Sequence, residues 1–399
     1  MLEYDQALTL IKANIPAPRR EFCPLGEGLQ RILAGDLFAR VPLPSFDNAA
    51  VDGYAVALHK RPGIEGPLQF RVMGEIRAGS ISRGALKPGE AAKIFTGAPV
   101  PKGADAVIMQ EQTQQLQNTV TIEIFPALSE NIRFRGEDIQ KGNLLLQKGT
   151  HLSAVHLAVA ASSGFARLPL IARTQVAVLT TGSELIRPGG RLKSGKIFDS
   201  NSILLEGLVQ EAGASPKSLG TTPDRPAEIL KQIRKGLKSD VLLIAGGVSV
   251  GDYDFVKALL KKEGGAEIFW KVNIKPGKPL FFGRKGKTLV FGLPGNPVSV
   301  FITFQEFVRP VLLAMGGRES KKQLCEGRLT QDYQNGSRRH FVRALCSENH
   351  QGYEITPLKG QGSHMLGSLA KANAILDLAP EACLKKGERV HVEKIGGMA

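Results

Sequence analysis

The sequence predicts a multidomain α/β and β protein: a central α/β domain with a mostly parallel sheet, a β-rich insert, a helical linker domain and a small C-terminal β domain. Three observations carry this prediction. Residues 172–319 alternate continuous apolar runs with helical patterns, residues 45–140 hold short apolar runs between glycine and proline turns, and residues 320–399 return to short alternating runs. Apolar strands that alternate with helices are typical of a parallel sheet covered on both faces, which binds ligands at the carboxyl ends of its strands.

The elements of the predicted α/β domain follow one another regularly. The expected strands cover residues 175–179, 240–244, 268–274 and 288–291. The expected helices run to Leu208 from a cap at Asn201 or Ser202, from Pro226 to Leu237, onward from Phe255 and onward from Pro297. Proline suits the first turn of a helix, because an N–H group there would have no helical partner.

The flanking segments form the other domains. Residues 1–44 and 141–171 are expected to make one discontinuous helical linker domain, with helices over residues 4–11, around residues 29–37 and over residues 155–161. Residues 45–140 form the β-rich insert, which interrupts that domain. Residues 320–399 form the C-terminal β domain. Short apolar runs such as residues 69–73, bounded by glycine and proline, favour strands in the insert.

Composition bounds the class of protein. The chain has 399 residues, of which 42% are hydrophobic, so several packed cores are expected. No apolar run approaches the ~18 residues of a membrane span, and the N-terminus lacks the basic and apolar segments of a secretion signal. The four cysteines are scattered without a CxxC pair. We therefore expect a cytoplasmic protein in a reducing compartment, with no membrane as partner.

The formal net charge of +15 raises the question of nucleic acid. Only 6% of the residues are aromatic, the lysines and arginines are spread along the chain, and no helix-turn-helix spacing is present. A solvated basic surface is therefore favoured, and nucleic acid is not expected as a partner. A small anionic substrate would also be attracted by this charge.

Two motifs suggest other chemistry but lack the required context. Residues 190–196 have the spacing of a phosphate-binding P-loop, but Ile197 stands where a magnesium-binding hydroxyl is needed. Residues 247–251 match the nucleophile elbow of hydrolases. The histidines that follow this motif fall in the terminal β domain, and Asp252 and Asp254 would place negative charge where an oxyanion has to form.

Loops at three predicted strand ends each carry some of glycine, a hydroxyl group and an acid. Glycines let backbone amides approach a phosphate closely, and carboxylates can hold magnesium. One such loop is weak support, because a lone acid after a strand is more often a helix cap. The loops contain Gly182, Ser183 and Glu184; Asp224; and Gly246, Gly247 and Ser249 leading to Asp254.

Three lysines come next. Lys271 and Lys275 are four residues apart, so within one strand they would face the same side, and Lys278 follows in a Pro-Gly turn. Three cations directed at one place suit a tetrahedral oxyanion or a phosphate, whereas a solvated edge strand is the alternative. The turn at Pro294, Gly295 and Pro297 then enters a helix whose first amides can also receive an anion.

Eight stretches together closely resemble the molybdopterin molybdenumtransferase family, which includes the E domain of gephyrin and plant relatives. They occur in the family's order and span most of the chain, which makes the resemblance specific. The stretches are residues 47–54, 96–108, 131–138, 181–185, 246–254, 274–279, 292–297 and 360–363.

The resemblance implies a molybdopterin-binding-like α/β domain within an elongated four-domain subunit. It implies a homodimer with its active site between subunits, one supplying the α/β domain and the other its β insert. The implied reaction takes adenylylated molybdopterin and molybdate, with Mg²⁺, and releases molybdenum cofactor and AMP. Other proteins of the molybdenum-cofactor pathway stay open as partners, and the choice between molybdate and tungstate stays open as well.

The resemblance also implies site residues. The catalytic positions fall on Asp52, Thr96, Glu184, Asp224, Asp254, Lys271 and Lys275, of which Glu184, Asp224 and Asp254 are the metal ligands. The cofactor-binding positions fall on Gly182, Ser183, Gly246, Gly247, Ser249, Lys278, Pro294, Gly295, Pro297 and Ser363. Arg135 and Asp138 are further positions of the same kind.

Two alternatives remain. A molybdopterin adenylyltransferase has a fold similar to the α/β domain, but it carries Gly-Gly-Thr-Gly where this chain has Gly-Gly-Val-Ser from residue 246, and it lacks the insert. A non-catalytic scaffold of the same fold is the other alternative, because the gephyrin relative also anchors receptors. The acids at all three loop positions favour a catalyst over a scaffold.

Overall fold

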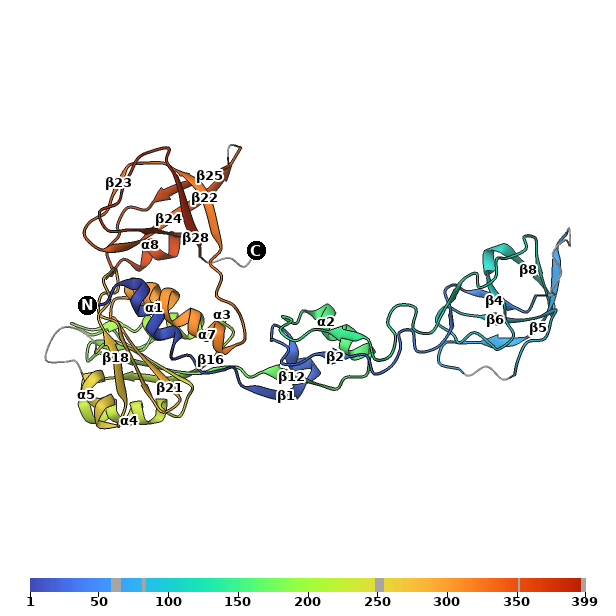
Figure 1. The fold of residues 1–399 in the computed structure, drawn as a ribbon, viewed down its shortest axis with the longest axis horizontal. Coiled ribbons are helices and arrows are strands. Elements are labelled where there is room, and N and C mark those ends of the chain that lie inside the picture. Colours follow the sequence, from blue (N-terminus) through green and yellow to red (C-terminus); the bar gives the residue numbers. More distant parts are fainter. Residues whose placement is uncertain (59–65, 81–83, 248–254, 351, 396–399) are drawn as a thin grey trace. The chain divides into compact units, whose positions relative to one another are not determined.

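The computed structural model describes residues 1–58, 66–80, 84–247, 255–350 and 352–395 (Figure 1). The chain divides into two compact units, one made of Met1–Glu21 with Ile171–Ala399 and the other of Phe22–Leu170. Ser249 and Asp254, two of the predicted site residues, lie outside the described residues.

The larger unit is built on a six-stranded sheet, as the predicted fold class requires. Its strands have the order β16-β13-β17-β21-β20-β18, in which β16, β13, β17 and β21 are mutually parallel, while β20 is antiparallel to both of its neighbours, β21 and β18. The bounds are β13 Gln175–Thr181, β16 Ser215–Thr222, β17 Val241–Ala245, β18 Ala266–Trp270, β20 Phe281–Lys285 and β21 Thr288–Leu293. The mostly parallel sheet is therefore confirmed.

Helices cover both faces of this sheet (Figure 1). In β13, Val176 and Val178 pack into the core on one face, whereas Ala177 and Leu179 pack into the core on the other. Because successive strand residues point to opposite faces, a strand that is apolar throughout needs two cores. The covering helices are α3 Asn201–Glu211, α4 Pro226–Gly236, α5 Phe255–Lys262, α6 Pro297–Thr303 and α7 Arg309–Met315.

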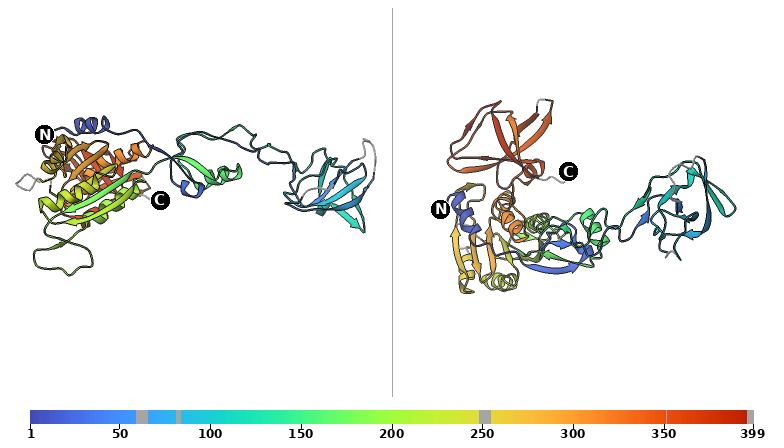
Figure 2. Two further views of the ribbon diagram at one scale, coloured as in Figure 1. Left: turned by 90° about the horizontal axis from the view of Figure 1, so that it is seen from below. Right: turned by 45° about the vertical axis from the view of Figure 1, so that its right-hand side comes forward.

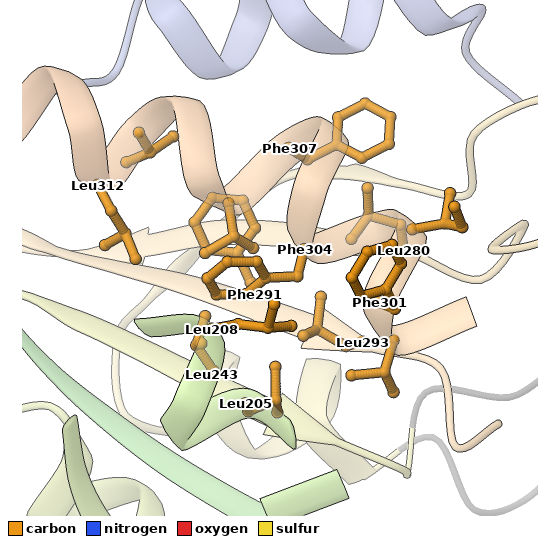
Figure 3. Close-up of a cluster of buried hydrophobic side chains, with 14 of the residues drawn as sticks. Leu205, Leu208, Leu243, Leu280, Phe291, Leu293, Phe301, Phe304, Phe307 and Leu312 are labelled. Atoms are coloured by element: carbon orange, nitrogen blue, oxygen red, sulfur yellow. The ribbon is translucent and has the colours of Figure 1, made fainter. Parts of the chain in front are cut away.

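The larger core lies between α3, the sheet and the continuous helical stretch α6–η3–α7, where η3 is a π-helical turn at Phe304–Val308. Figure 3 shows side chains of these elements gathered in it, among them Leu205, Phe291 and Phe304. Among the described helices, Pro297–Met315 alone is long and apolar enough to cross a membrane, but 78% of it is buried inside the protein. It is a core helix in this structure.

Helix α1, Tyr4–Lys12, packs into the same core through Tyr4, Ala7 and Ile11. The Tyr4 hydroxyl donates to buried Glu306 at 2.5 Å, and Lys322 Nζ donates to the same carboxylate at 2.7 Å. We expected this helix in the linker domain, but its apolar stripe is covered by the helices of the α/β part. The domain boundaries stay a prediction.

The C-terminal part is a β structure with its own core. Its sheet has the order β19-β24-β25-β22-β28-β26, and an additional β24–β26 pairing closes part of it into a ring. The bounds are β19 Ile274–Lys275, β22 Leu324–Leu329, β23 Tyr333–Gln334, β24 Arg339–Asn349, β25 Gly352–Pro357, α8 Leu366–Lys371, β26 Ala374–Leu378, β27 Cys383–Leu384 and β28 Arg389–Lys394. The predicted terminal β structure is confirmed.

The Phe22–Leu170 unit holds the β-rich insert, whose strands form a six-stranded sheet of order β7-β4-β6-β5-β9-β8. Figure 2 shows these strands, blue to turquoise, gathered in one compact body. The bounds are β4 Gly53–Val56, β5 Leu68–Ile76, β6 Glu90–Ile94, β7 Ala106–Met109, η2 Gln110–Gln112, β8 Thr113–Leu116 and β9 Thr119–Ile122.

The rest of this unit carries helix α2, Ala154–Ser162, and short ladders. The ladders pair β1 Arg20–Pro24 with β12 Arg167–Ile171, β2 Leu37–Phe38 with β11 Leu144–Leu146, and β3 Asn48–Ala49 with β10 Ile132–Arg133. The helix expected around residues 29–37 is wrong. The short 3₁₀ turn η1, Leu25–Gly28, precedes this stretch, and the amides of Leu33 and Ala34 bond to the carbonyls of Thr150 and Pro169 instead of to a helix.

Candidate functional site

A cleft of about 920 Å³ lies in the larger unit at the carboxyl ends of the parallel strands. The three predicted loops and the predicted turn at Pro294 meet there, because β13, β16, β17 and β21 run in the same direction and end at one edge of the sheet. The lining includes the predicted residues Gly182, Glu184, Asp224, Gly246, Gly247, Lys275, Lys278, Pro294, Gly295, Pro297 and Ser363. The sheet thus brings together side chains that lie up to 181 positions apart in the sequence.

The loops after β13 and β16 are tied to each other. The Ser183 amide donates to Asp224 Oδ2 at 3.0 Å, and the Asp224 amide donates to Ser183 Oγ at 3.1 Å. This reciprocal pair leaves the other Asp224 oxygen and the whole Glu184 carboxylate for the cleft, which both residues line. Ser183 does not line the cleft itself, so its part is to hold the two loops together.

Glycine is required at Gly246, where β17 turns into the cleft. Its φ is +92°, which disfavours side chains, and a Cβ placed there would lie 2.4 Å from the Thr181 carbonyl oxygen. Only a residue without a side chain lets these neighbouring strand ends approach so closely. The sequence analysis assigned Gly246 to phosphate binding, and the structure adds a steric reason for glycine at this position.

The three predicted lysines do not share a strand. Strand β18 ends at Trp270, and Lys271 has a left-handed backbone with φ +73°. Lys271 Nζ lies 3.8 Å from the centre of the Trp270 ring, and Lys271 does not line the cleft. The strand predicted over residues 268–274 is therefore confirmed only as far as Trp270, and its continuation to Ile274 is wrong. Lys275 belongs to β19 in the C-terminal sheet, and it reaches the cleft with Lys278.

The C-terminal part closes one side of the cleft near the start of α6. The Val298 amide donates to the Ser363 carbonyl at 3.2 Å, and Asn296 Nδ2 donates to Ser363 Oγ at 2.9 Å. Pro294 and Pro297 fix the turn between β21 and the helix on either side of these contacts. Ser363 is thus placed at a helix start, where backbone amides favour an anion.

Several cleft residues were not predicted as site residues, although two of them, Asn296 and Gln361, lie inside two of the eight stretches named above. Asp199, 1% exposed, accepts from Thr180, Thr221 and the Ser202 amide, and so fixes the start of α3. The others include Asn201, Asn296, Arg338, Gln361 and His364. Asn201 was expected only as a helix cap, but its Nδ2 donates to the Gly295 carbonyl at 2.7 Å.

Asp52 and Thr96 belong to the other unit, and there they contact each other. The Thr96 amide and hydroxyl both donate to Asp52 Oδ1 at 2.7 Å. The hydroxyl bond, followed by the amide bond, lowers the pKa of Asp52 below its ordinary value. Both residues are exposed, so the insert presents a carboxylate that is already ionised at neutral pH. Nearby, the Arg135 amide donates to Asp47 and the Asp138 amide to the Leu43 carbonyl.

The described residues contain no group of three His, Cys, Asp or Glu side chains arranged for a metal ion. Glu184 and Asp224 nevertheless line one cleft beside cationic side chains. Magnesium is commonly held by one or two carboxylates together with substrate phosphates. The two acids therefore fit such an ion when a phosphorylated ligand supplies the remaining oxygens.

A parallel α/β sheet whose strand ends carry two acids, in a cleft that also holds two lysines from β19 and the turn after it, defines an enzyme for an anionic, phosphorylated substrate. Three family profiles match the chain: "MoeA N-terminal region (domain I and II)" over residues 2–164, "Probable molybdopterin binding domain" over residues 177–314, and "MoeA C-terminal region (domain IV)" over residues 326–395. The chain belongs to the molybdopterin molybdenumtransferase family.

Individual relatives agree over nearly the whole chain. A molybdopterin molybdenumtransferase of Haemophilus influenzae is 37% identical, covering 98% of both chains. That of Bacillus subtilis is 35% identical, covering 90% of this chain and 85% of the relative. The crystal structure of a molybdopterin biosynthesis MoeA protein from Pyrococcus horikosii superimposes with a TM-score of 0.82 at 31% identity, covering 100% of both chains.

Proposed function

We propose that this chain inserts molybdate into adenylylated molybdopterin in the presence of Mg²⁺, releasing molybdenum cofactor and AMP. The observation that carries the proposal is the cleft in which Glu184 and Asp224 lie with Lys275 and Lys278. Such a cleft has acids for a metal-bound pyrophosphate and cations for an oxyanion. In the proposed reaction, a water oxygen bonds to a phosphorus of the pyrophosphate as the anhydride P–O bond breaks, and AMP leaves. The two dithiolene sulfurs replace two oxygen ligands of molybdate, which leave as water with the two thiol protons and two protons from solvent.

Glu184, Asp224 and Asp254 are the proposed magnesium ligands. When bound, the ion would neutralise charge on the pyrophosphate as the anhydride is cleaved. Support comes from the reciprocal bonds between Ser183 and Asp224, which fix the two loops, and from Glu184 and Asp224, which both line the cleft. Gly182, Gly246, Gly247 and Ser249 are proposed to bring backbone and hydroxyl donors to the phosphates.

Lys275 and Lys278 are the proposed ligands of molybdate or of the pterin phosphate, with Ser363, Pro294, Gly295 and Pro297 shaping that end of the cleft. Fixed cations in a partly enclosed site stabilise an oxyanion more strongly than in water. Lys271 receives a smaller share, because its ammonium lies over the Trp270 ring.

Asp52 and Thr96 are proposed to act from the insert of a partner subunit in a cytoplasmic homodimer. Support for their joint role is the pair of hydrogen bonds that hold Thr96 on Asp52. The lowered pKa of Asp52 keeps a negative charge available to orient a donor group of the substrate. The pathway partners stay open.

The deciding experiment is AMP release from adenylylated molybdopterin with Mg²⁺, with and without molybdate. Release that depends on molybdate supports the transferase. AMP release that is indifferent to molybdate, or consumption of ATP with release of pyrophosphate, would instead identify an adenylyltransferase. No turnover in either assay would favour the scaffold.

A matched control guards against contaminating hydrolases. Glu184→Gln removes one proposed metal ligand, and we expect it to lower AMP release by about 10²-fold. Glu228→Gln changes an exposed glutamate in the first turn of α4, paired with Arg225 at 3.1 Å, and is expected to keep full activity. Equal activity of the two variants would contradict the assignment.

A further inference from the structure

Arg343 of strand β24 is 0% exposed, and it is the largest fully buried side chain among the described residues. Its Nη2 donates to the Gly360 carbonyl at 2.8 Å and to the Gly362 carbonyl at 3.2 Å. Its Nε and Nη1 have no hydrogen-bond partner among the described residues, and no carboxylate there forms an ion pair with it. Among the described residues, the buried guanidinium is thus hydrogen-bonded to two backbone carbonyls and to nothing else.

Stability does not account for this arginine. A buried charge without a counter-charge is unfavourable, and an apolar side chain of similar size is often better tolerated. Burial lowers the pKa of Arg343 below its usual value, but a guanidinium stays protonated in proteins. The side chain is therefore a positive charge held in the interior, which calls for a functional reason.

The segment that Arg343 holds is part of the cleft. Gln361 clamps the Arg343 backbone, accepting from its amide at 3.1 Å and donating to its carbonyl at 2.9 Å. Gln361, Gly362 and Ser363 line the cleft. The same segment joins the start of α6 through Ser363, so Arg343 connects the terminal β core to the cleft wall.

Arg343 also adds to the positive charge at this end of the cleft. Lys275 and Arg338 line the cleft, and both lie near His340, as Arg343 does. The pKa of His340 falls to about 4, first because the imidazole is buried and then because the charges of these three cations act on it. Lys275, the cross-strand neighbour of His340, and Arg338 both line the cleft, so their charges favour an anion there.

We propose that Arg343 is a positioning residue that holds residues 360–363 against the cleft and, with Lys275 and Arg338, sets the positive potential at which the oxyanion substrate binds. The identity of that oxyanion as molybdate rests on the proposed function. The positioning of residues 360–363 does not depend on it.

Arg343→Met tests the inference in the full chain, because methionine is apolar and suits a buried position. We expect amide exchange over residues 360–365 to become at least about tenfold faster and the KM for molybdate to rise about tenfold, with kcat within about twofold. Arg339→Met is the matched control. Arg339 lies on the same strand and pairs with Asp377 at 2.7 Å, so its loss alters neither the exchange of residues 360–365 nor the KM for molybdate.

Unchanged exchange over residues 360–365 in Arg343→Met overturns the inference, whatever the activity. Faster exchange with an unchanged KM for molybdate also overturns it, because the segment would then not serve the anion. If Arg343→Met does not fold, Arg343→Lys replaces it, since lysine keeps the charge but not the two-carbonyl contact, and the same two measurements apply. A wild-type protein that releases no AMP with molybdate would refute the proposed function, while the exchange measurement still decides on Arg343.

Discussion

Lys271 and Lys275 have similar sequence surroundings but different contacts. Lys275 lines the cleft, whereas Lys271 Nζ lies 3.8 Å from the centre of the Trp270 ring. A cation held on an aromatic face is stabilised there by about 1 kcal/mol and has less reason to enter the cleft. Residue spacing alone could not separate the two, because the strand ends between them.

Replacing each lysine by alanine separates these environments. We expect Lys275→Ala to lower kcat/KM for molybdate-dependent AMP release by about 10²-fold, because a cation facing the developing charge is lost. Lys271→Ala is expected to lower it by less than about fivefold, since it removes a surface stacking contact. Steady-state kinetics of both variants measure the difference. Equal losses would show that Lys271 reaches the substrate despite its stacked position.

His340 makes the free energy of unfolding depend on pH. Its pKa is lowered from 6.5 in the unfolded chain to about 4 in the folded protein, mainly by burial. On acidification the unfolded state therefore binds this proton first, so the folded state loses stability as the pH falls from about 6.5 to 4 and keeps it above 6.5. Between pH 7.5 and 5 the loss should be about 1–2 kcal/mol.

Urea unfolding at pH 7.5 and 5 measures that loss. His340→Gln cannot take up the proton, so its stability should fall by about 1–2 kcal/mol less over the same range than that of the wild type. His350→Gln changes an exposed histidine of the same domain and should track the wild type. The idea fails if His340→Gln and His350→Gln show the same pH dependence.

At the scale of elements, the sharp turn after β17 holds neighbouring strand ends in contact. A Cβ at Gly246 would lie 2.4 Å from the Thr181 carbonyl oxygen, in a backbone with φ +92°. Gly286 also has positive φ, +57°, but a Cβ there meets nothing within 4 Å. Replacing each glycine by alanine therefore distinguishes two costs. At Gly246 the side chain meets both a steric clash and a positive φ, whereas at Gly286 it meets a positive φ alone.

Gly246→Ala is expected to cost about 2–4 kcal/mol of unfolding free energy and at least tenfold in activity, because the strand ends must move apart. Gly286→Ala should cost only about 1–2 kcal/mol and leave activity intact. Chemical denaturation and AMP release on both variants provide the measurement. Comparable costs for the two substitutions would mean that the edge of the sheet adapts to a side chain at Gly246.

The elements that the sequence predicted are those decided by local pattern. Helix α4 begins at Pro226 and α6 at Pro297, as expected, because proline and apolar periodicity act within a few residues. The helix around residues 29–37 failed, because the Leu33 amide finds its partner at Thr150, far away in the sequence. Long-range backbone pairing overrides local propensity, and one sequence does not reveal it.

The same distinction holds for the site. Loops at the ends of parallel strands were predictable as neighbours, because topology brings strand ends to one edge. Arg338 was not, since it reaches the cleft through the terminal β structure, whose packing on the α/β part no local pattern encodes. Asp199 was not predicted as a cleft residue for another reason, since its carboxylate accepts hydrogen bonds within the protein from two threonines and a helix amide.

At the scale of the whole molecule, the proposed site residues fall in both compact units. Asp52 and Thr96 belong to the Phe22–Leu170 unit, and the acids and lysines of the cleft belong to the other. Two arrangements satisfy this division: the units of one subunit act together, or the insert of one subunit serves the cleft of its partner. In the proposed homodimer, mixed dimers distinguish them, because a two-fold symmetric dimer has two equivalent sites.

Co-expression of Asp52→Ala and Glu184→Ala subunits carries the test. Random pairing makes half of the dimers mixed, and in each mixed dimer one site combines the intact insert of one subunit with the intact cleft of the other. About a quarter of all sites are then complete, so activity should recover to about a quarter of the wild-type value, although either variant alone is nearly inactive.

As the control, Asp52→Ala is paired with the Asp52→Ala, Glu184→Ala double variant, a mixture in which no shared site is complete. Recovery in the first mixture but not in the second requires a site shared between subunits. No recovery in isolated mixed dimers would place each active site within a single subunit, because a shared site would have to produce one working centre in every such dimer.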